Sequence, residues 1–147
     1  MGVMKSLKIQ LAFLTIILCF SSCKENNVSK DAFSSKEMLI RIAELEIYPE
    51  YIEEYKEILK EEAEASVRVE PGVVSIFPMY QTENPNQIRI LEIYADKKAY
   101  ESHLEAPHFQ YYKTNTQRMV KSLKLIDMKA IDEESMPEIF KKIDGHN

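Results

Sequence analysis

Two β-rich runs separated by a short polar turn are the feature that most restricts the fold of this chain. The runs are VVSIFPMYQ, residues 73–81, and QIRILEIYA, residues 87–95, and TENPN lies between them. Such runs around an Asn-Pro-Asn turn predict an antiparallel hairpin. Pro78 has no backbone N–H to donate to a neighbouring strand, which indicates an edge position or a bulge. The fold must therefore contain a sheet that includes this hairpin.

A strand and a helix precede the hairpin. Residues 38–47, MLIRIAELEI, are rich in aliphatic side chains and alternate well enough to form a strand. The next segment has Pro49 at a position suited to a first helical turn, and a stripe of residues follows at three- and four-residue spacing. The stripe consists of Ile52, Tyr55, Leu59, Ala63 and Ser66. It predicts one buried helix face, and Pro71-Gly72 ends the helix.

Helical and strand patterns also follow the hairpin. We expect a helix over about 96–104, a break near Pro107, a second helix over about 108–121 and a last strand over 123–131. The complete order is strand, helix, strand, strand, helix, strand. It predicts an α+β fold of the ferredoxin-like βαββαβ type with a four-stranded antiparallel sheet.

The strands carry apolar side chains on both faces of this sheet. In the third strand, Leu91 and Ile93 alternate with Ile90 and Tyr94. Two helical segments can cover only one face, so the other face would leave a large apolar patch in a monomer. Packing of two sheets about a twofold axis removes that patch. We therefore expect a homodimer.

The first 22 residues differ from the rest of the chain. Lys5 and Lys8 precede an apolar run over residues 9–20, which is shorter than the roughly 20 residues of a membrane span. A charged start, a short apolar middle and small residues at the end indicate a secretory signal. The ending CFSSC resembles a bacterial lipoprotein signal, which implies cleavage before Cys23, a lipid on that residue and a membrane-anchored protein of the bacterial cell envelope. An ordinary secreted protein cleaved nearby is the alternative.

Cleavage before Cys23 sets the expected organisation and charge of the mature chain. Residues 23–37 are polar and predict a flexible tether, residues 38–131 the folded domain, and residues 132–147 a tail with one short amphipathic helix. The signal removes two of the 19 basic residues, so 17 face 24 acidic ones, a formal charge of −7. An anionic chain without a basic stretch is a poor partner for nucleic acid or anionic lipid headgroups, so we expect membrane contact through the lipid alone.

Cleavage and lipidation also remove cysteine chemistry. Cys19 leaves with the signal and Cys23 becomes the anchor, so the mature chain keeps no free thiol. Disulfides, cysteine nucleophiles and cysteine metal sites are excluded together.

The stretch LEIYADKKAYESHLEAPHFQYY carries a resemblance to a known family. It resembles the signature of the antibiotic biosynthesis monooxygenase family, which includes quinol monooxygenases. Their motif has a strand ending in Glu-x-Trp, an Asp or Ser at the helix start, then Ala and His, and then Pro-His and an apolar residue. The corresponding residues here are Glu92, Tyr94, Asp96, Ala99, His103, Pro107, His108 and Phe109. The likeness covers residues 38–131, and EPGVVSIFPMYQ resembles the Pro-Gly opening of the second strand.

The resemblance implies a dimeric α+β barrel with a ligand pocket between sheet and helices in each subunit. Some members oxidise quinols or polycyclic phenols with dioxygen and no cofactor, others degrade haem, and others isomerise small metabolites. Haem-degrading members resemble one another in an Asn, a Trp and a His, for which this chain has Ala43, Tyr94 and about Lys113. Haem oxygenation is therefore not expected. The chain has no Gly-rich cofactor loop, in agreement with chemistry that needs no cofactor.

Glu92 and His103 are the candidate catalytic residues. Strand alternation places Glu92 and Tyr94 on one face, which we expect to be the helix face. A carboxylate there must be paired or become neutral, and His103 is a plausible partner. Such a pair beside an apolar pocket could remove a phenolic proton. The alternative is that both residues serve packing alone.

The candidate substrate-binding residues are Tyr94, His108, Phe109, Tyr112 and Tyr80. Phe109, Tyr112 and Thr116 share a helical stripe, although such stripes belong more often to a core than to a ligand site. His108 lies in a first helical turn, where a capping role competes with a pocket role. His103 and His108 do not share a helix face and no cysteine supports them, so we expect no metal site.

The sequence thus favours a cofactor-free monooxygenase that oxidises a small quinol or aromatic compound with dioxygen. A non-catalytic, envelope-tethered binder of small apolar ligands and an isomerase of a small metabolite are the alternatives.

Overall fold

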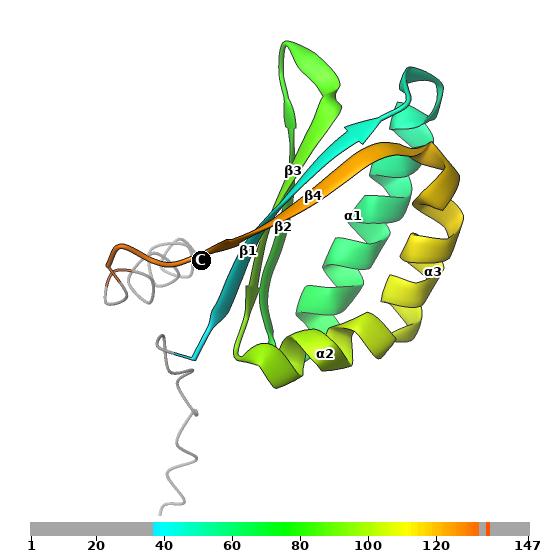
Figure 1. Ribbon diagram of the computed structural model, residues 1–147. Coiled ribbons are helices and arrows are strands. Elements are labelled where there is room, and N and C mark those ends of the chain that lie inside the picture. Colours follow the sequence, from blue (N-terminus) through cyan, green and yellow to red (C-terminus); the bar gives the residue numbers. More distant parts are fainter. Residues whose placement is uncertain (1–36, 133–134, 136–147) are drawn as a thin grey trace, which may run out of the picture. The chain divides into compact units, whose positions relative to one another are not determined.

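The computed structural model describes residues 37–132 and 135, and this part of the chain forms a sheet with helices on one face (Figure 1). The elements are β1 (Leu39–Ile47), η1 (Pro49–Tyr51), α1 (Ile52–Val69), β2 (Val73–Gln81), β3 (Asn84–Tyr94), α2 (Lys97–Glu105), α3 (Pro107–Thr116), η2 (Gln117–Met119) and β4 (Val120–Met128). The strand order is β2-β3-β1-β4, and all neighbours are antiparallel. The prediction of a ferredoxin-like βαββαβ fold is confirmed, with β2 and its Pro78 at an edge.

The boundaries of the hairpin, of the last helix and of the last strand differ from the sequence prediction. The hairpin turns at residues 82–83, so that Asn84 already pairs with Gln81 and the Asn-Pro-Asn segment belongs to β3. The last helix ends at Thr116, earlier than expected, and β4 begins at Val120 and ends at Met128. Met119 explains the early end, because its side chain is fully buried and its carbonyl accepts a 3.0 Å hydrogen bond from the Tyr48 amide. These contacts turn the chain from α3 into the sheet.

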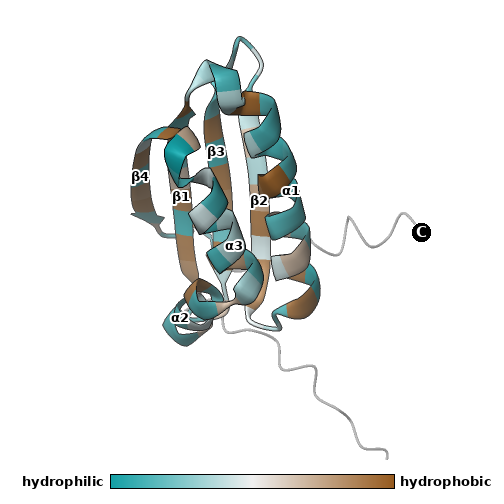
Figure 2. Cartoon of the chain, turned by 90° about the vertical axis from the view of Figure 1, so that its right-hand side faces the viewer, coloured by the Kyte–Doolittle hydropathy of each residue, from teal (hydrophilic) through white to brown (hydrophobic). Residues whose placement is uncertain are grey.

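The core lies between the sheet and the helices. In Figure 2, α1 and α3 run in front of the sheet and turn mainly polar surfaces outward, while β4 at the left-hand edge has no helix in front of it. Alternate residues of β1 and β3 are buried together with the predicted stripe of α1. The core contains Ala43, Leu45, Ile47, Tyr55, Leu59, Ala63, Ile88, Ile90, Tyr94 and Met119.

Among the described residues, no helix is long and apolar enough to cross a membrane. The expected signal, Cys23 and the tether up to residue 36 lie outside the described residues. So does the tail from residue 133 onward, apart from residue 135.

Gly72 allows α2 to pack closely against the start of β2. A Cβ atom at this position would lie 2.5 Å from the Cβ of Ala99, which real Cβ atoms essentially never show. The Gly72 carbonyl also accepts a 2.8 Å hydrogen bond from the amide of Ala95, just before α2. The absent side chain therefore fixes how near α2 lies to the sheet.

We expect Gly72→Ala to destabilise the protein by roughly 1–3 kcal/mol, because two methyl groups would occupy the same space. Urea unfolding measures the loss. Adding Ala99→Gly should recover part of it, although that change alone costs about 1 kcal/mol within a helix. Equal losses from Gly72→Ala in both backgrounds would contradict this contact as the cause.

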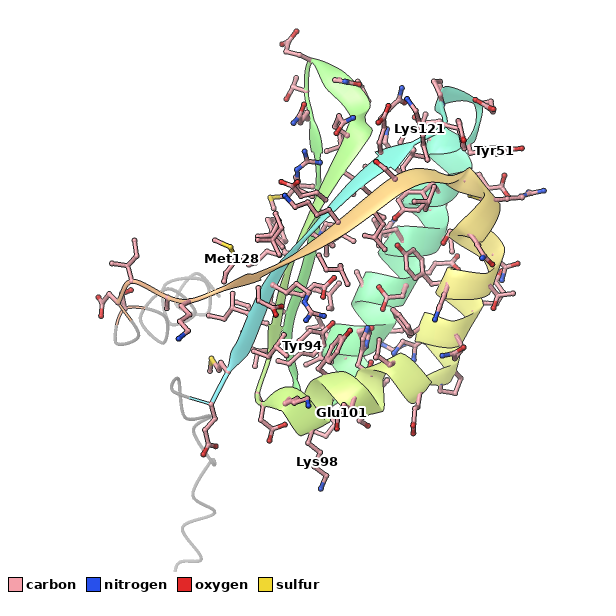
Figure 3. The ribbon with its side chains drawn as sticks, viewed as in Figure 1. Tyr51, Tyr94, Lys98, Glu101, Lys121 and Met128 are labelled. Atoms are coloured by element: carbon pink, nitrogen blue, oxygen red, sulfur yellow. The ribbon has the colours of Figure 1, made fainter. Side chains whose placement is uncertain are left out.

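The sheet face opposite the helices carries an apolar row, next to a row that contains Arg89, Glu44 and Lys124. Phe77, Leu91, Ile42 and Ile126 lie next to one another in a row across all the strands. Phe77 is 58% exposed, and Met128, which Figure 3 places on the side away from the helices, is 47% exposed. We propose that a second copy of the chain covers this face, since a monomer would leave it in water.

The proposed dimer predicts that Leu91→Glu gives monomers, because the change places a charge in the middle of the apolar row. Sedimentation equilibrium of the wild type should give the dimer mass. Val67→Glu makes the same kind of change at a half-exposed site on α1 and should leave the dimer intact. A wild type that stays monomeric at high concentration would rule out this role for the face.

Candidate active site

A cavity of about 470 Å³ lies between the helix-facing side of the sheet and the three helices. That volume falls within the usual range of small-molecule pockets. Its strand walls are Arg41, Ala43, Leu45, Ile76, Ile90, Glu92, Tyr94, Val120, Leu123 and Leu125. Its helix walls are Leu59, Glu62, Tyr100, His103, Leu104, Phe109, Tyr112, Lys113, Thr116 and, just beyond α3, Gln117. Most of these side chains are apolar or aromatic, so few polar groups are available to interact with a ligand.

Glu92 and Tyr94 both face the helices, as strand alternation predicts. Figure 3 shows Tyr94 between sheet and helices, whereas Lys98 and Glu101 project outward from α2. The Tyr94 hydroxyl donates a 3.3 Å hydrogen bond to Glu92 Oε2. Burial raises the pKa of Glu92 to about 7, although the Tyr94 hydroxyl and the charge of Arg41 oppose the rise. The cavity wall therefore holds a carboxyl group that changes charge near neutral pH.

Glu62 is a second buried carboxyl group in the cavity wall, and the sequence analysis missed it. The residue is 5% exposed, and its Oε1 accepts a 2.7 Å hydrogen bond from the Ser66 hydroxyl. Burial raises its pKa, against the opposing effects of Ser66 and His103. The signal was present in the sequence: Glu62 lies three residues after Leu59 and four before Ser66, on the predicted buried stripe.

His103 has other carboxylate partners than the predicted Glu92. Its Nδ1 forms a 2.9 Å hydrogen bond with Glu70 Oε1, and its Nε2 lies 3.6 Å from Glu62 Oε1. The same Glu70 oxygen lies 2.6 Å from His108 Nε2. Both nitrogens of His103 are thus directed at carboxylates. Its ring packs at a tilt against the rings of Tyr94 and Phe109.

The break between α2 and α3 brings the two histidines together. Ala106 is extended, with ψ of 138°, and Pro107 then starts a new helix in a different direction. His103 and His108 therefore point at one carboxylate from two helices, with ring centroids 6.3 Å apart. The expectation of no metal site rested on the absence of a shared helix face, but here the break at Pro107 is what brings the two imidazoles to one carboxylate. His108 lines a second groove, together with Glu70, rather than the cavity.

Comparisons with known proteins bear on the fold and the family. The family described as antibiotic biosynthesis monooxygenase matches residues 38–115. A crystal structure from Bacteroides thetaiotaomicron, provisionally described as such an enzyme, shares 44% identity over 67% of this chain and 94% of that chain, with a TM-score of 0.67. The chain belongs to the antibiotic biosynthesis monooxygenase family. Membership supports monooxygenase chemistry at the level of the family.

Two further solved structures are similar to this member of the family. One from Lactobacillus acidophilus, provisionally described as a monooxygenase, shares 28% identity over 62% of this chain and 43% of that longer chain, with a TM-score of 0.61. One from Nitrosomonas europaea shares 20% identity over 65% of this chain and 91% of that chain, with a TM-score of 0.61, and supports the fold alone. The comparison with curated proteins found no match.

Phe109 and Tyr112 line the cavity, whereas Tyr80 does not. The hydroxyls of Tyr112 and Tyr55 lie 2.7 Å apart, and burial raises the pKa of Tyr112 to about 12 and that of Tyr55 further. Tyr80 is 56% exposed on the edge strand β2, with the Lys56 ammonium 4.5 Å from its ring centre. Of the five residues predicted to bind substrate, the structure places three on the cavity wall and puts His108 and Tyr80 elsewhere.

The three positions that differ from haem-degrading members all lie on this cavity. Ala43 is on β1, Tyr94 on β3 and Lys113 on α3, and each lines the wall. The departures from the haem pattern therefore fall where a ligand of this family member would sit.

The variant Glu92→Gln tests the effect of burial on this carboxyl group. Its ordinary pKa is 4.5, and its pKa in the folded chain is about 7. Between these values the folded state keeps a proton that the unfolded state loses, so stability falls as pH rises through this range. We expect Glu92→Gln to gain roughly 1–2 kcal/mol relative to the wild type between pH 4.5 and pH 8, because an amide carries no charge to bury.

Urea unfolding at a series of pH values measures this difference. Glu101→Gln makes the same chemical change on the outer side of α2, where Glu101 pairs with Lys97 at 3.4 Å, and serves as the control. A difference between Glu92→Gln and wild type that stays constant with pH would show that burial does not hold the proton.

Proposed function

We propose that this protein oxidises a small quinol or related phenol with dioxygen, without a cofactor, in the cavity between sheet and helices. The observation that carries the proposal is Glu92, a buried carboxyl group with a pKa near 7 on the wall of an otherwise largely apolar cavity. A general base works best when its pKa lies near the working pH. The family membership reported above supports monooxygenase chemistry, and the choice of substrate and base is our inference.

Glu92 takes the role of the base in this proposal, in preference to His103. Both ring nitrogens of His103 are directed at other carboxylates, Glu70 and Glu62. Among the described residues, one donor is bonded to the Glu92 carboxylate, the Tyr94 hydroxyl at 3.3 Å, which leaves acceptor capacity for a substrate hydroxyl. His103 then acts as a positioning residue, since its ring contacts Tyr94 and Phe109 on the cavity wall.

The chemistry needs no electron source besides the substrate. Glu92 removes a phenolic proton, and the resulting phenolate is electron-rich enough to react with dioxygen. One oxygen atom enters the ring and the other leaves as water, so that a hydroquinone gives a hydroxyquinone. The substrate supplies all the electrons for both steps. An apolar cavity favours this course because it keeps water from the reactive intermediates.

The carboxyl and phenol groups of the cavity favour a neutral substrate over an anionic one, although Lys113 adds a cationic group to the wall. Glu62 and Glu92 both have raised pKa values, and the phenols of Tyr55, Tyr94 and Tyr112 stay protonated at neutral pH. The guanidinium of Arg41 pairs with Asp127 at 2.7 Å and stacks on Tyr100, so its charge is already balanced. These features fit a phenol better than a phosphorylated sugar.

Oxygen uptake with a panel of hydroquinones tests the proposal. We expect the wild type to consume dioxygen, with kcat/KM rising as pH passes through about 7 and Glu92 loses its proton. Glu92→Gln should lower kcat by roughly 100-fold or more, since a general base typically contributes 10²–10⁴-fold.

A control variant and the oxygen dependence of the reaction separate the proposed oxidation from the alternatives. Glu101→Gln should keep wild-type kcat, because that side chain lies outside the cavity. Tight binding of hydroquinones without oxygen uptake would indicate a binding protein, and turnover that proceeds equally well without oxygen would indicate an isomerase. Full activity in Glu92→Gln would show that another group is the base.

A further inference from the structure

Glu70, His103 and His108 form a compact group of side chains that the proposed oxidation does not use. Glu70 follows the last residue of α1, His103 lies in the last turn of α2, and His108 lies in the first turn of α3. One donor atom from each lies within 4.8 Å of the others. The side chains are 13%, 3% and 20% exposed, respectively, so the group is largely shielded from water.

These donors match those of known transition-metal sites. Two imidazoles and one carboxylate bind zinc in several enzymes and leave a coordination position open, and the same set suits other first-row divalent metals. Glu70 Oε1 lies 2.9 Å from His103 Nδ1 and 2.6 Å from His108 Nε2. Donors around a tetrahedral ion lie roughly 3.4 Å apart, given metal–ligand bonds of about 2.1 Å. The two distances from Glu70 Oε1 to the imidazole nitrogens would therefore lengthen by roughly 0.5–0.8 Å around an ion.

We propose that Glu70 Oε1, His103 Nδ1 and His108 Nε2 bind a divalent transition-metal ion, with water from the adjoining groove as a further ligand. This site is separate from the oxidation chemistry and does not rest on it.

The surroundings of His103 support a metal in particular. A histidine that binds a metal through one nitrogen usually donates its other ring N–H to a carboxylate, which fixes the ring and its tautomer. Here Nδ1 points at the site, and Nε2 lies 3.6 Å from Glu62 Oε1. Glu62 is itself held by the Ser66 hydroxyl at 2.7 Å. A carboxyl group therefore lies close to the position of such an outer partner, just beyond hydrogen-bond distance of Nε2.

The charges of the group point the same way. Two carboxyl groups, Glu62 and Glu70, flank His103, and both are largely buried. A divalent cation binds carboxylate oxygens and neutral imidazoles, so an ion at this site would lie beside both carboxyl groups.

An ion can reach the site from outside without passing through the cavity. Glu70 and His108 line a groove on the surface, with Gly72, Ser102 and Pro107 among its other walls. His103 lines the cavity on the other side. A bound ion would join the end of α1 to the corner between α2 and α3, and so fix the wall that separates groove and cavity.

Metal binding by the full chain tests the proposal. The chain carries Cys19→Ser and Cys23→Ser, which remove its two thiols. Titration with Zn²⁺ against a competing chelator should give one tight equivalent per chain, and Co²⁺ should give a visible absorption spectrum. X-ray absorption of the zinc form should show two imidazoles and no sulfur. Saturating Zn²⁺ should raise Tm, because the ion binds the folded chain.

Variants assign the ligands. Glu62→Gln should weaken binding by roughly 10–100-fold, the usual effect of losing an outer partner, and His108→Gln or Glu70→Gln by more than that. His146→Gln removes the remaining histidine of the chain and should leave the affinity unchanged. Circular dichroism shows whether each variant is folded.

Two results would overturn the proposal. The first is wild-type protein that binds no Zn²⁺ beyond the chelator, in which case Glu70 only accepts hydrogen bonds from two imidazoles. The second is a bound ion whose affinity is the same in folded His108→Gln as in the wild type, since the ion would then lie elsewhere. Both results can be read whether or not the protein oxidises quinols.

Discussion

One carboxylate oxygen, Oε1 of Glu70, holds the end of the cavity together. It contacts an imidazole from α2 and another from α3, while its own residue ends α1, so three helices meet at one atom. The position of this oxygen is set in turn by Pro71 and Gly72, which stop α1, and by the close contact between Gly72 and Ala99 that draws α2 toward the sheet. The geometry of the site thus depends on a glycine that has no side chain of its own to contribute.

Burial between the sheet and the helices gives Glu62 and Glu92 higher pKa values than exposed carboxyl groups have. Glu92 stands on β3 opposite Arg41 of β1, and Glu62 stands on α1 opposite His103. Tyr94 and Arg41 favour the charged form of Glu92, and Ser66 and the histidines favour that of Glu62. Burial outweighs these effects and raises both pKa values. The partial opposition matters for chemistry. A fully unopposed carboxyl group would hold its proton too tightly to act as a base, while a well-paired one would be too weak a base to take a phenolic proton.

The fold and part of the site could be predicted from the sequence, because sequence patterns report only on residues that lie a few positions apart. Alternation along β3 acts over two residues, and it correctly placed Glu92 and Tyr94 on the helix face. The stripe on α1 acts over three or four residues, and it correctly predicted the buried side, although Glu62 on that side was overlooked.

The partner of His103 lies 33 residues away in sequence, and that of His108 lies 38 residues away. No local pattern reports such a contact, so pairing His103 with Glu92, a near neighbour in sequence, was a reasonable inference and a wrong one. The prediction that Tyr80 lines the pocket was wrong for a different reason. Strand alternation predicts the face on which Tyr80 lies, but it does not predict how far the helices extend over that face.

His103 belongs both to the wall of the cavity and to the proposed metal site. Its ring forms part of the cavity wall beside Tyr94 and Phe109, and its Nδ1 points away from the cavity toward Glu70. A metal ion on Nδ1 would hold the ring in one tautomer and one orientation, with Nε2–H directed at Glu62. The ion would then shape the cavity through the histidine without touching a substrate. Such an arrangement would keep a redox-active or Lewis-acidic ion out of reach of the proposed phenolate. That separation suits a reaction in which the substrate alone should pass electrons to dioxygen, because a metal inside the cavity would offer the phenolate a competing ligand position.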